Sequence, residues 1–163
     1  MLRAADQPKL AAGNSPSQAG AQRMEYVCDA PGDRTWFRIV TEGEAAAESE
    51  AMRHAVEKHF RRERERAAES FRSASTVFIE QDIGKEAHIR RAMPLFLTLR
   101  DQDGQVLVTA MLPPGGKRDA NFGCIIVGPA NADPYPDHGD AIKALGEHYD
   151  LTLDRARCYP YRR

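Results

Sequence analysis

A thirty-residue run without glycine or proline, "EAAAESEAMRHAVEKHFRRERERAAESFRS" (44–73), constrains the fold of this chain most strongly. Alanine, glutamate and arginine dominate it, and these residues favour the α-helix. Its apolar residues near one helical face are Met52, Val56, Phe60, Ala67 and Phe71. One helix of this length would be about 45 Å long, whereas a six-residue strand spans about 20 Å. The predicted long helix must therefore break or overhang its sheet, and "RRERER" (61–66) is the expected overhang.

Short segments rich in β-branched and aromatic residues predict the strands. These segments are 35–41, 76–81, 94–100, 105–112 and 124–128. "DQDG" separates two of them and predicts a hairpin. The stretch 82–93 is predicted to be a connection with a helical turn, and 141–149 a short second helix. Strands joined by short turns predict an α+β fold, with an antiparallel sheet of four to five strands, one long helix packed on it and a short C-terminal helix.

Length and composition suggest three parts. Residues 1–23 are rich in Ala, Gln, Ser, Gly and Pro. Such a segment buries too little apolar surface to offset the conformational entropy that it would lose on folding, so a disordered tail is expected. Residues 24–154 are expected to form a single α+β domain, since 163 residues suit one core. Residues 155–163 form a basic C-terminal tail. Met24 is also a candidate start of the folded protein, and the sequence leaves open whether 1–23 belong to it.

Charge and cysteine content restrict the classes of partner and compartment. The 23 Lys and Arg residues nearly balance the 24 Asp and Glu residues, so any affinity for a polyanion must be local. Three cysteines, far apart and without a CxxC pair, argue against a disulfide framework and a structural zinc site. Every apolar run is shorter than the about 18 residues that a membrane-spanning helix needs. We expect a cytoplasmic protein that has no membrane association and no cofactor.

The segment "LPPGGKRDANFG" (112–123) has the composition of either a phosphate-binding loop or a wide turn. A Walker loop needs GxxxxGK followed by Ser or Thr at the start of a helix. Here Arg118 follows Lys117, the upstream glycine is missing, and a strand is expected next. Pro113 and Pro114 end the incoming strand, and the glycines permit a turn. We interpret the segment as a turn with solvated Lys117 and Arg118, and keep a looser anion site as the alternative.

A loop rich in carboxylates is the main candidate for metal binding or hydrolysis. Its candidate ligands are Asp133, Asp137, His138 and Asp140. The spacing matches no calcium loop, and capping of the second helix by Asp140, or by Asp137 with Asp140, explains it more simply. Cys124, at the edge of an apolar run, is interpreted as a small core residue and not as a nucleophile. His54 and His59 are five residues apart on the predicted helix, which excludes a helical metal pair. No catalytic residues are assigned.

Arginine and tyrosine at two places support a second hypothesis, binding of nucleic acid or another polyanion. The candidate residues are Arg61, Arg62, Lys117, Arg118, Arg157, Tyr159, Tyr161 and Arg162. Charges within the helix alternate in sign and can pair with one another, and the tail tyrosines can instead dock on the domain. Solvation or docking is therefore the simpler interpretation.

The sheet itself supplies the leading functional hypothesis. Leu95, Leu97 and Leu99 are expected to pack under the long helix together with Phe37 and Ile39. The opposite face then presents apolar side chains that one helix cannot cover, among them Trp36, Phe96, Leu107 and Met111. That face must be covered by the short helix and tail, a second copy, or a ligand. We therefore expect a small binding or interaction module that self-associates through an apolar sheet face. A hydrolase-like enzyme that uses the Asp/His loop and Cys124 is a further alternative.

Overall fold

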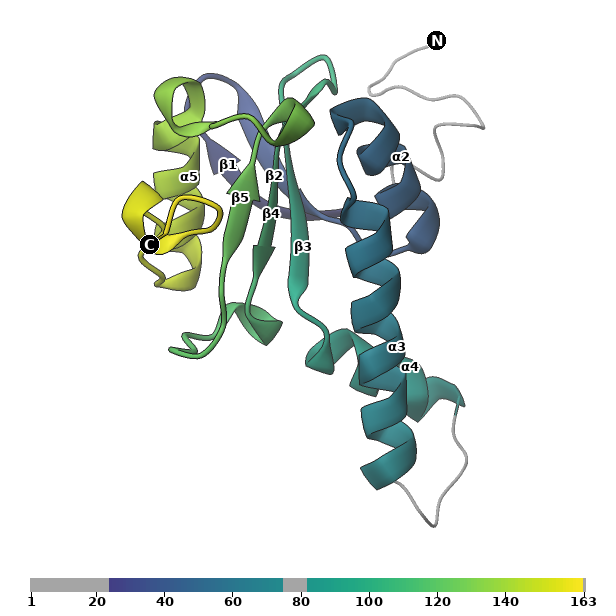
Figure 1. Cartoon of the computed structure of the whole chain (residues 1–163). Helices are drawn as coiled ribbons and strands as arrows, with labels where there is room; N and C mark the ends of the chain where they lie inside the picture. Colours follow the sequence, from purple (N-terminus) through teal and green to yellow (C-terminus); the bar gives the residue numbers. More distant parts are fainter. Residues whose placement is uncertain (1–23, 75–81, 163) are drawn as a thin grey trace, which may run out of the picture.

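The computed structural model describes residues 24–74 and 82–162. Within these ranges the chain forms a five-stranded antiparallel sheet in the order β1-β2-β3-β4-β5, with helices on both faces (Figure 1). The strands are β1 (Glu25–Ala30), β2 (Arg34–Arg38), β3 (Leu95–Arg100), β4 (Val106–Leu112) and β5 (Ile125–Val127). This architecture confirms the predicted α+β class. The expected tail 1–23 and the expected strand 76–81 lie outside the described residues.

Two hairpins build most of the sheet. The predicted hairpin of β3 and β4 is present, and its turn is closed by Asp101, whose Oδ1 accepts from the backbone N of Asp103 and of Gln105, each at 2.9 Å. The hairpin of β1 and β2 was not predicted. It turns at Gly32 and Asp33, both with positive φ. β1 is an edge strand that carries charged residues, so it lacks the continuous apolar pattern of a central strand.

The predicted helical run is present and is broken, one of the two outcomes that its length allowed, into α2 (Glu42–Met52) and α3 (Val56–Ala74). Thr41 and Glu44 form a capping box at the start of α2. Arg53 ends α2 in the left-handed conformation, with φ 55°. The Ser49 hydroxyl accepts from the backbone N of Glu57 at 2.8 Å and so satisfies a free donor at the start of α3. The break redirects the chain and shortens the helix that lies against the sheet.

The far half of α3 extends beyond the sheet, as expected for the segment 61–66 (Figure 1). There it packs on α4 (Asp82–Ala92), a helix in the stretch that was predicted to be mostly a connection. Arg64 Nη2 and Glu86 Oε2 join the two helices at 2.9 Å, and the rings of Phe71 and His88 lie 5.4 Å apart. A helical arm therefore extends from one end of the domain.

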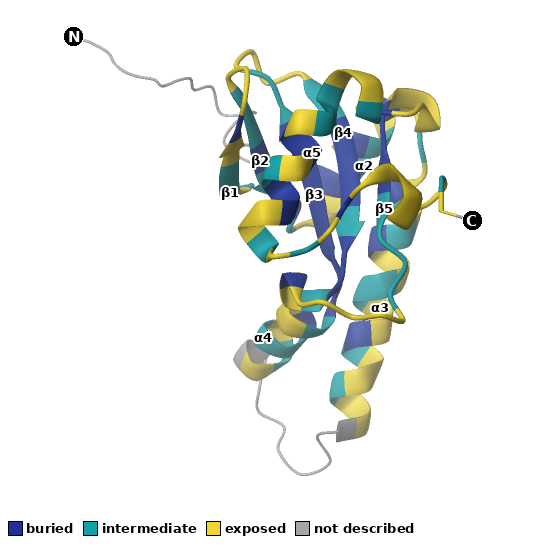
Figure 2. Cartoon of the chain, turned by 90° about the vertical axis from the view of Figure 1, so that its left-hand side faces the viewer, coloured by how far each residue is buried: buried dark blue, intermediate teal, exposed yellow. Residues whose placement is uncertain are grey.

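The two sheet faces are covered by different helices, and the predicted assignment of the faces was right for Ile39, which packs with Phe60 of α3, and wrong for the leucines of β3. Leu95, Leu97 and Leu99 do not lie under the long helix; with Trp36 they pack against α5 (Tyr135–Tyr149), which covers the strands in Figure 2. The indole Nε1 of Trp36 donates to the carbonyl of Ala141 at 2.9 Å. Phe96 faces α3 and its ring meets Phe60 edge-on at 5.2 Å. Both faces are apolar, as predicted, and both carry helices of the same chain.

The loop between β4 and β5 is the turn of an antiparallel strand pair, in agreement with the simpler interpretation. Gly116 adopts φ 69°, and a Cβ there would lie 2.2 Å from Cδ1 of Tyr149, so only glycine fits this close approach. At the other side of β5, the C-terminal segment pairs with the strand edge. The backbone N of Tyr159 donates to Cys124 at 2.8 Å, and that of Ile126 donates to Tyr159 at 3.1 Å. The C-terminal segment thus covers part of this edge.

Candidate functional site

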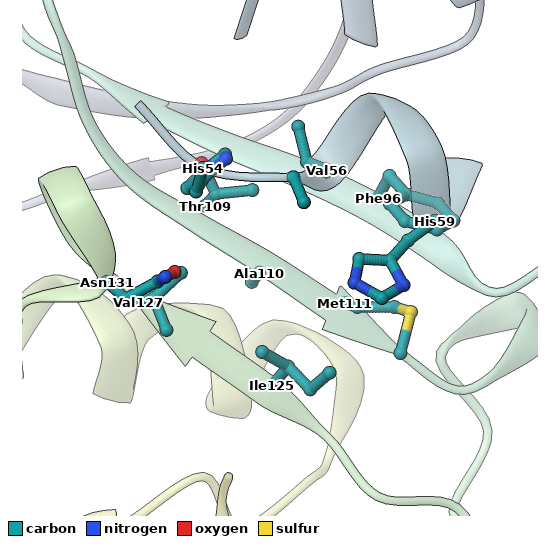
Figure 3. A pocket seen from close by; sticks show the side chains of 11 residues that line it. His54, Val56, His59, Phe96, Thr109, Ala110, Met111, Ile125, Val127 and Asn131 are labelled. Atoms are coloured by element: carbon teal, nitrogen blue, oxygen red, sulfur yellow. The ribbon is translucent and has the colours of Figure 1, made fainter. Parts of the chain in front are cut away.

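A cavity of about 140 Å³ opens between the α2–α3 break and the β4–β5 side of the sheet (Figure 3). Its apolar lining comes from Val56, Phe96, Met111, Ile125 and Val127. Its polar lining comes from His54, His59, Thr109 and Asn131. Of these, Thr109 and Met111 lie on β4, and Asn131 follows β5. The cavity is therefore a largely apolar space with a few polar groups, which is the usual composition of a small-molecule site.

The break between the helices brings the two histidines to this cavity. His54 lies within the break, and His59 lies in the first turns of α3. The sequence argument against a helical pair assumed that both histidines lie on one continuous helix. The helix instead ends at Arg53, which adopts the left-handed conformation. In Figure 3 the His59 ring lies next to Met111, while His54 lies beside Thr109. Within the described ranges, no group of three or more His, Cys, Asp or Glu side chains is arranged to hold a metal ion.

A buried polar network supports the His54 end of the cavity. The Nε2 atom of His54 lies 2.9 Å from Thr109 Oγ1, and the same hydroxyl donates to Glu48 Oε2. Glu48 comes from α2 and its residue is 0% exposed. Arg100 Nη2 reaches Glu48 Oε1 at 3.4 Å from the end of β3. Four side chains from α2, the break, β3 and β4 thus form one hydrogen-bonded chain.

The pKa values of this network are set mainly by burial. Burial raises the pKa of Glu48, although hydrogen bonds from Thr109 and the charge of Arg100 oppose the increase. Burial lowers the pKa of His54, which is therefore neutral at pH 7. While Glu48 is ionised, Thr109 donates to it and accepts from the Nε2–H of His54, so the Nδ1 of His54 is an acceptor. That Nδ1 is buried and has no hydrogen-bond partner within the described residues.

The protonation of His59 follows from its neighbour. Arg62 Nη2 lies 2.7 Å from His59 Nδ1, and a guanidinium can only donate. The proton of neutral His59 is therefore on Nε2. Burial, together with the positive charge of Arg62, lowers the pKa of His59. The cavity thus combines apolar walls with two histidines whose pKa values are lowered mainly by burial.

The sheet residues predicted as an interface have different environments. Phe96 and Met111 line the cavity, and Phe96 is almost fully buried. Trp36 is 0% exposed on the opposite face, under α5. Leu107 packs with the core of that opposite face, because the β3–β4 register shifts and places Val106 opposite Arg100. Only half of the predicted set therefore shares one site.

The carboxylate-rich loop holds α5 to the β1–β2 hairpin. Arg34 donates to both Asp140 carboxylate oxygens at 2.8 and 2.9 Å, and its Nη1 lies 2.8 Å from His138 Nδ1. Asp133 accepts from the backbone N of Tyr135 and from Arg155 Nε. α5 begins at Tyr135, so the prediction that Asp140 caps its start was wrong. Asp137 is exposed beside this cluster. These contacts give most of the loop a structural role.

The candidate polyanion-binding residues do not form one surface. α3, with Arg61 and Arg62, and the C-terminal segment lie on opposite faces of the sheet (Figure 1). Their contacts include Arg61 with Glu57, Arg62 with His59, Arg118 with the Asp150 carbonyl, Arg157 with Asp154, Arg162 over the Tyr159 ring, and Tyr161 against Tyr135 and Arg155. Lys117 is exposed. Tyr161 thus docks on the domain, as the simpler interpretation expected, whereas Tyr159 remains 43% exposed.

Cys124 lies at the edge of β5 and is half-buried. Burial raises its pKa to about 11, and the neighbouring Cys158 adds to the increase. A thiol with so high a pKa contains very little thiolate at pH 7 and is a poor nucleophile. The interpretation of Cys124 as a packing residue agrees with these properties.

Sequence reasoning missed Glu48, Thr109 and Arg100. Glu48 resembles the exposed glutamates around it in sequence, and only the approach of α2 to β4 buries it. One signal was present in the sequence: Thr98 and Thr109 each interrupt a strand that is otherwise almost entirely apolar. In the structure these two threonines lie opposite each other on β3 and β4. Two inward hydroxyls on paired strands indicate a buried polar partner.

In the part of the chain that the structure describes, no helix combines the length and apolarity needed to cross a bilayer. Comparisons with protein families, curated proteins and solved structures find no match for this chain.

Proposed function

We propose that this protein is a small-molecule binding module whose site is the cavity lined by His54, His59 and Met111. The observation that carries the proposal is the composition of this cavity, which has apolar walls and a buried network from Glu48 to His54 at one end. A buried polar network is costly unless its members are satisfied, and here it holds Thr109 and His54 in fixed positions at the cavity wall.

The volume limits the ligand to a small molecule. A protein cavity of about 150 Å³ lined by aliphatic and aromatic side chains binds benzene. The cavity here, of about 140 Å³, is therefore suited to a single six-membered ring or a short aliphatic chain. Neutral histidines at pH 7 favour an uncharged ligand. A hydroxyl group suits the polar lining, since it both donates and accepts hydrogen bonds and the lining includes the polar side chains of His59 and Asn131.

Self-association through the sheet is a weaker form of the binding hypothesis. Trp36 and Phe96 are buried within the chain, so neither is available to a second copy without rearrangement. Among the described residues, the exposed large hydrophobic side chains are Tyr26 and Tyr159, near opposite edges of the sheet. A stable dimer needs a continuous apolar patch, which two separated tyrosines do not provide. We therefore propose a monomer, and size exclusion with light scattering tests it. The three free thiols support a reducing compartment such as the cytosol.

Phenol is a suitable probe for the proposed site, because it combines one six-membered ring with one hydroxyl. We expect phenol to raise the melting temperature in a saturable manner, because a ligand that binds only the folded state stabilises it. Toluene, which has the same ring and no hydroxyl, is expected to bind more weakly.

Two matched substitutions distinguish binding in the cavity from binding elsewhere. Ile125→Phe adds volume to a half-buried side chain in the cavity, and Leu107→Phe adds it to a half-buried side chain outside the cavity. The proposal predicts at least about tenfold weaker phenol binding for Ile125→Phe and little change for Leu107→Phe, since a filled cavity has no room for the ring. Equal effects of the two substitutions, or no saturable binding to the wild type, would contradict it.

A further inference from the structure

A second cavity, of about 280 Å³, lies where the end of β2 meets α3 and α4. It shares no lining residue with the cavity at His54. Its apolar wall includes Ile39, Phe60, Ile89 and Met93. Its charged lining consists of Arg38, Arg64, Glu86 and Arg90. An apolar wall combined with several guanidinium groups is unusual, because burial near apolar surface disfavours unpaired charge.

The charges at this cavity do not cancel. Arg64 pairs with Glu86 at 2.9 Å, and Arg90 pairs with Glu25 of the edge strand. Arg38 is half-buried, and one of its nitrogens, Nη2, donates to the backbone carbonyl of Arg90 at 3.1 Å. Glu25 lies opposite Arg38 in the β1–β2 register, so its carboxylate acts on Arg38 as well as on Arg90. Three guanidinium groups facing two carboxylates leave a surplus of one positive charge.

The position of Arg38 explains why this surplus is important. Burial lowers the pKa of Arg38, and the nearby charge of Arg90 lowers it further, whereas the charge of Glu25 opposes the decrease. The fold therefore holds two like charges close together in a partly desolvated place. An anion bound there would reduce the repulsion between Arg38 and Arg90 and would accept hydrogen bonds from the guanidinium of Arg38.

We propose that this cavity binds a small monocarboxylate with an apolar chain. The carboxylate would accept a bidentate pair of hydrogen bonds from Arg38, a geometry that the planar guanidinium favours. The chain would lie against Ile89, Met93 and Phe60. The cavity is about twice the volume of one that binds benzene, which suits a chain of about six to eight carbons. The apolar wall argues against a phosphate dianion, because it offers no hydrogen bonds to the additional oxygens.

Octanoate is the probe for this site, measured by calorimetric titration of the full chain. We expect saturable binding that weakens as salt increases, because a charge pair contributes to it. 1-Octanol keeps the chain and lacks the charge, and it is expected to bind at least about tenfold more weakly. Arg38→Gln should reduce octanoate affinity by at least about tenfold, whereas Arg66→Gln, a control in the exposed part of α3, should leave it unchanged.

Three results would overturn the proposal: no saturable binding of octanoate, equal binding of 1-octanol, or full affinity in Arg38→Gln. If Arg38→Gln does not fold, methyl NMR of the wild type decides, since octanoate must then shift Ile89 and Met93 and not Ile125. Arg38→Gln is expected to bind phenol normally, so failure of this site and failure of the His54 cavity are separate outcomes.

Discussion

The two faces of the sheet have the same apolar character and different uses. Under α5, the core side chains are fully buried, with Trp36, Leu97 and Leu145 all 0% exposed. Under α2 and α3, the packing is interrupted by the Glu48–Thr109–His54 network and by the cavity at Met111. The difference arises from the helices, because α5 packs Ala141, Ile142 and Leu145 on its face beyond a kink at His138, whereas the other face is covered by a helix pair that breaks at Arg53. We infer that one face stabilises the fold and the other carries the site.

The largest expected effect is on the α5 face. Leu145→Ala removes a fully buried side chain from a close-packed core and should lower the free energy of unfolding by about 3 kcal/mol. Met111→Ala removes a half-buried side chain that already borders a cavity, and about 1 kcal/mol is expected. Urea denaturation of both variants measures the difference. Equal losses would show that the two faces are packed alike.

The second effect concerns the buried ion pair. Arg100→Met leaves Glu48 as a buried carboxylate without its cation, and a loss of about 2–3 kcal/mol is expected at pH 7. The double variant Arg100→Met/Glu48→Leu removes both charges and should recover part of that loss. Denaturation of the two variants in parallel tests this. A double variant less stable than Arg100→Met would mean that Glu48 does not need Arg100.

The pH dependence of stability provides a third test. Burial raises the pKa of Glu48 in the folded state above its ordinary value of 4.5, so its contribution to stability is full below that value and is lost as the pH rises through the folded pKa. Glu48→Gln removes this dependence. The stability of Glu48→Gln relative to the wild type should therefore increase as pH rises above 4.5. A relative stability that decreases with pH would show that Arg100 and Thr109 outweigh burial.

The success of sequence reasoning also differed between parts of the molecule. The β3–β4 hairpin was predictable because alternation and the Asp101–Gly104 turn are local features. The break at Arg53 was not, because a non-glycine residue in the left-handed conformation has no local signature. The assignment of faces failed because β3 is apolar on both sides, so alternation separates Leu97 from Phe96 without showing which helix covers each. The Thr41–Glu44 capping box was readable and marks the start of α2.

Ligand binding should also respond to pH if the cavity contains neutral histidines. The pKa values of His54 and His59 are lowered below 6.5, mainly by burial, so both are neutral above that pH. Phenol affinity should be constant from pH 8 to 6.5 and fall several-fold at lower pH, as protonation introduces charge into an apolar cavity. Titrations across this range test the assignment. Affinity that rises on acidification would exclude the neutral imidazoles as the polar lining.

The smallest effect is expected in the helical arm. Arg66→Gln removes an exposed ion pair with Glu63 and should change the free energy of unfolding by less than about 0.5 kcal/mol. Thermal denaturation at low and high salt measures it. A loss above about 1 kcal/mol would indicate that α3 beyond the sheet contributes to the core more than its exposure suggests.

Methyl NMR of the wild-type protein titrated with phenol compares the two faces most directly. We predict saturable shifts at the methyl groups of Met111, Ile125 and Val127, and none at those of Leu97 and Leu145. Shifts concentrated at Leu97 and Leu145, or spread evenly over both faces, would contradict the assignment of the binding site to the α3 face.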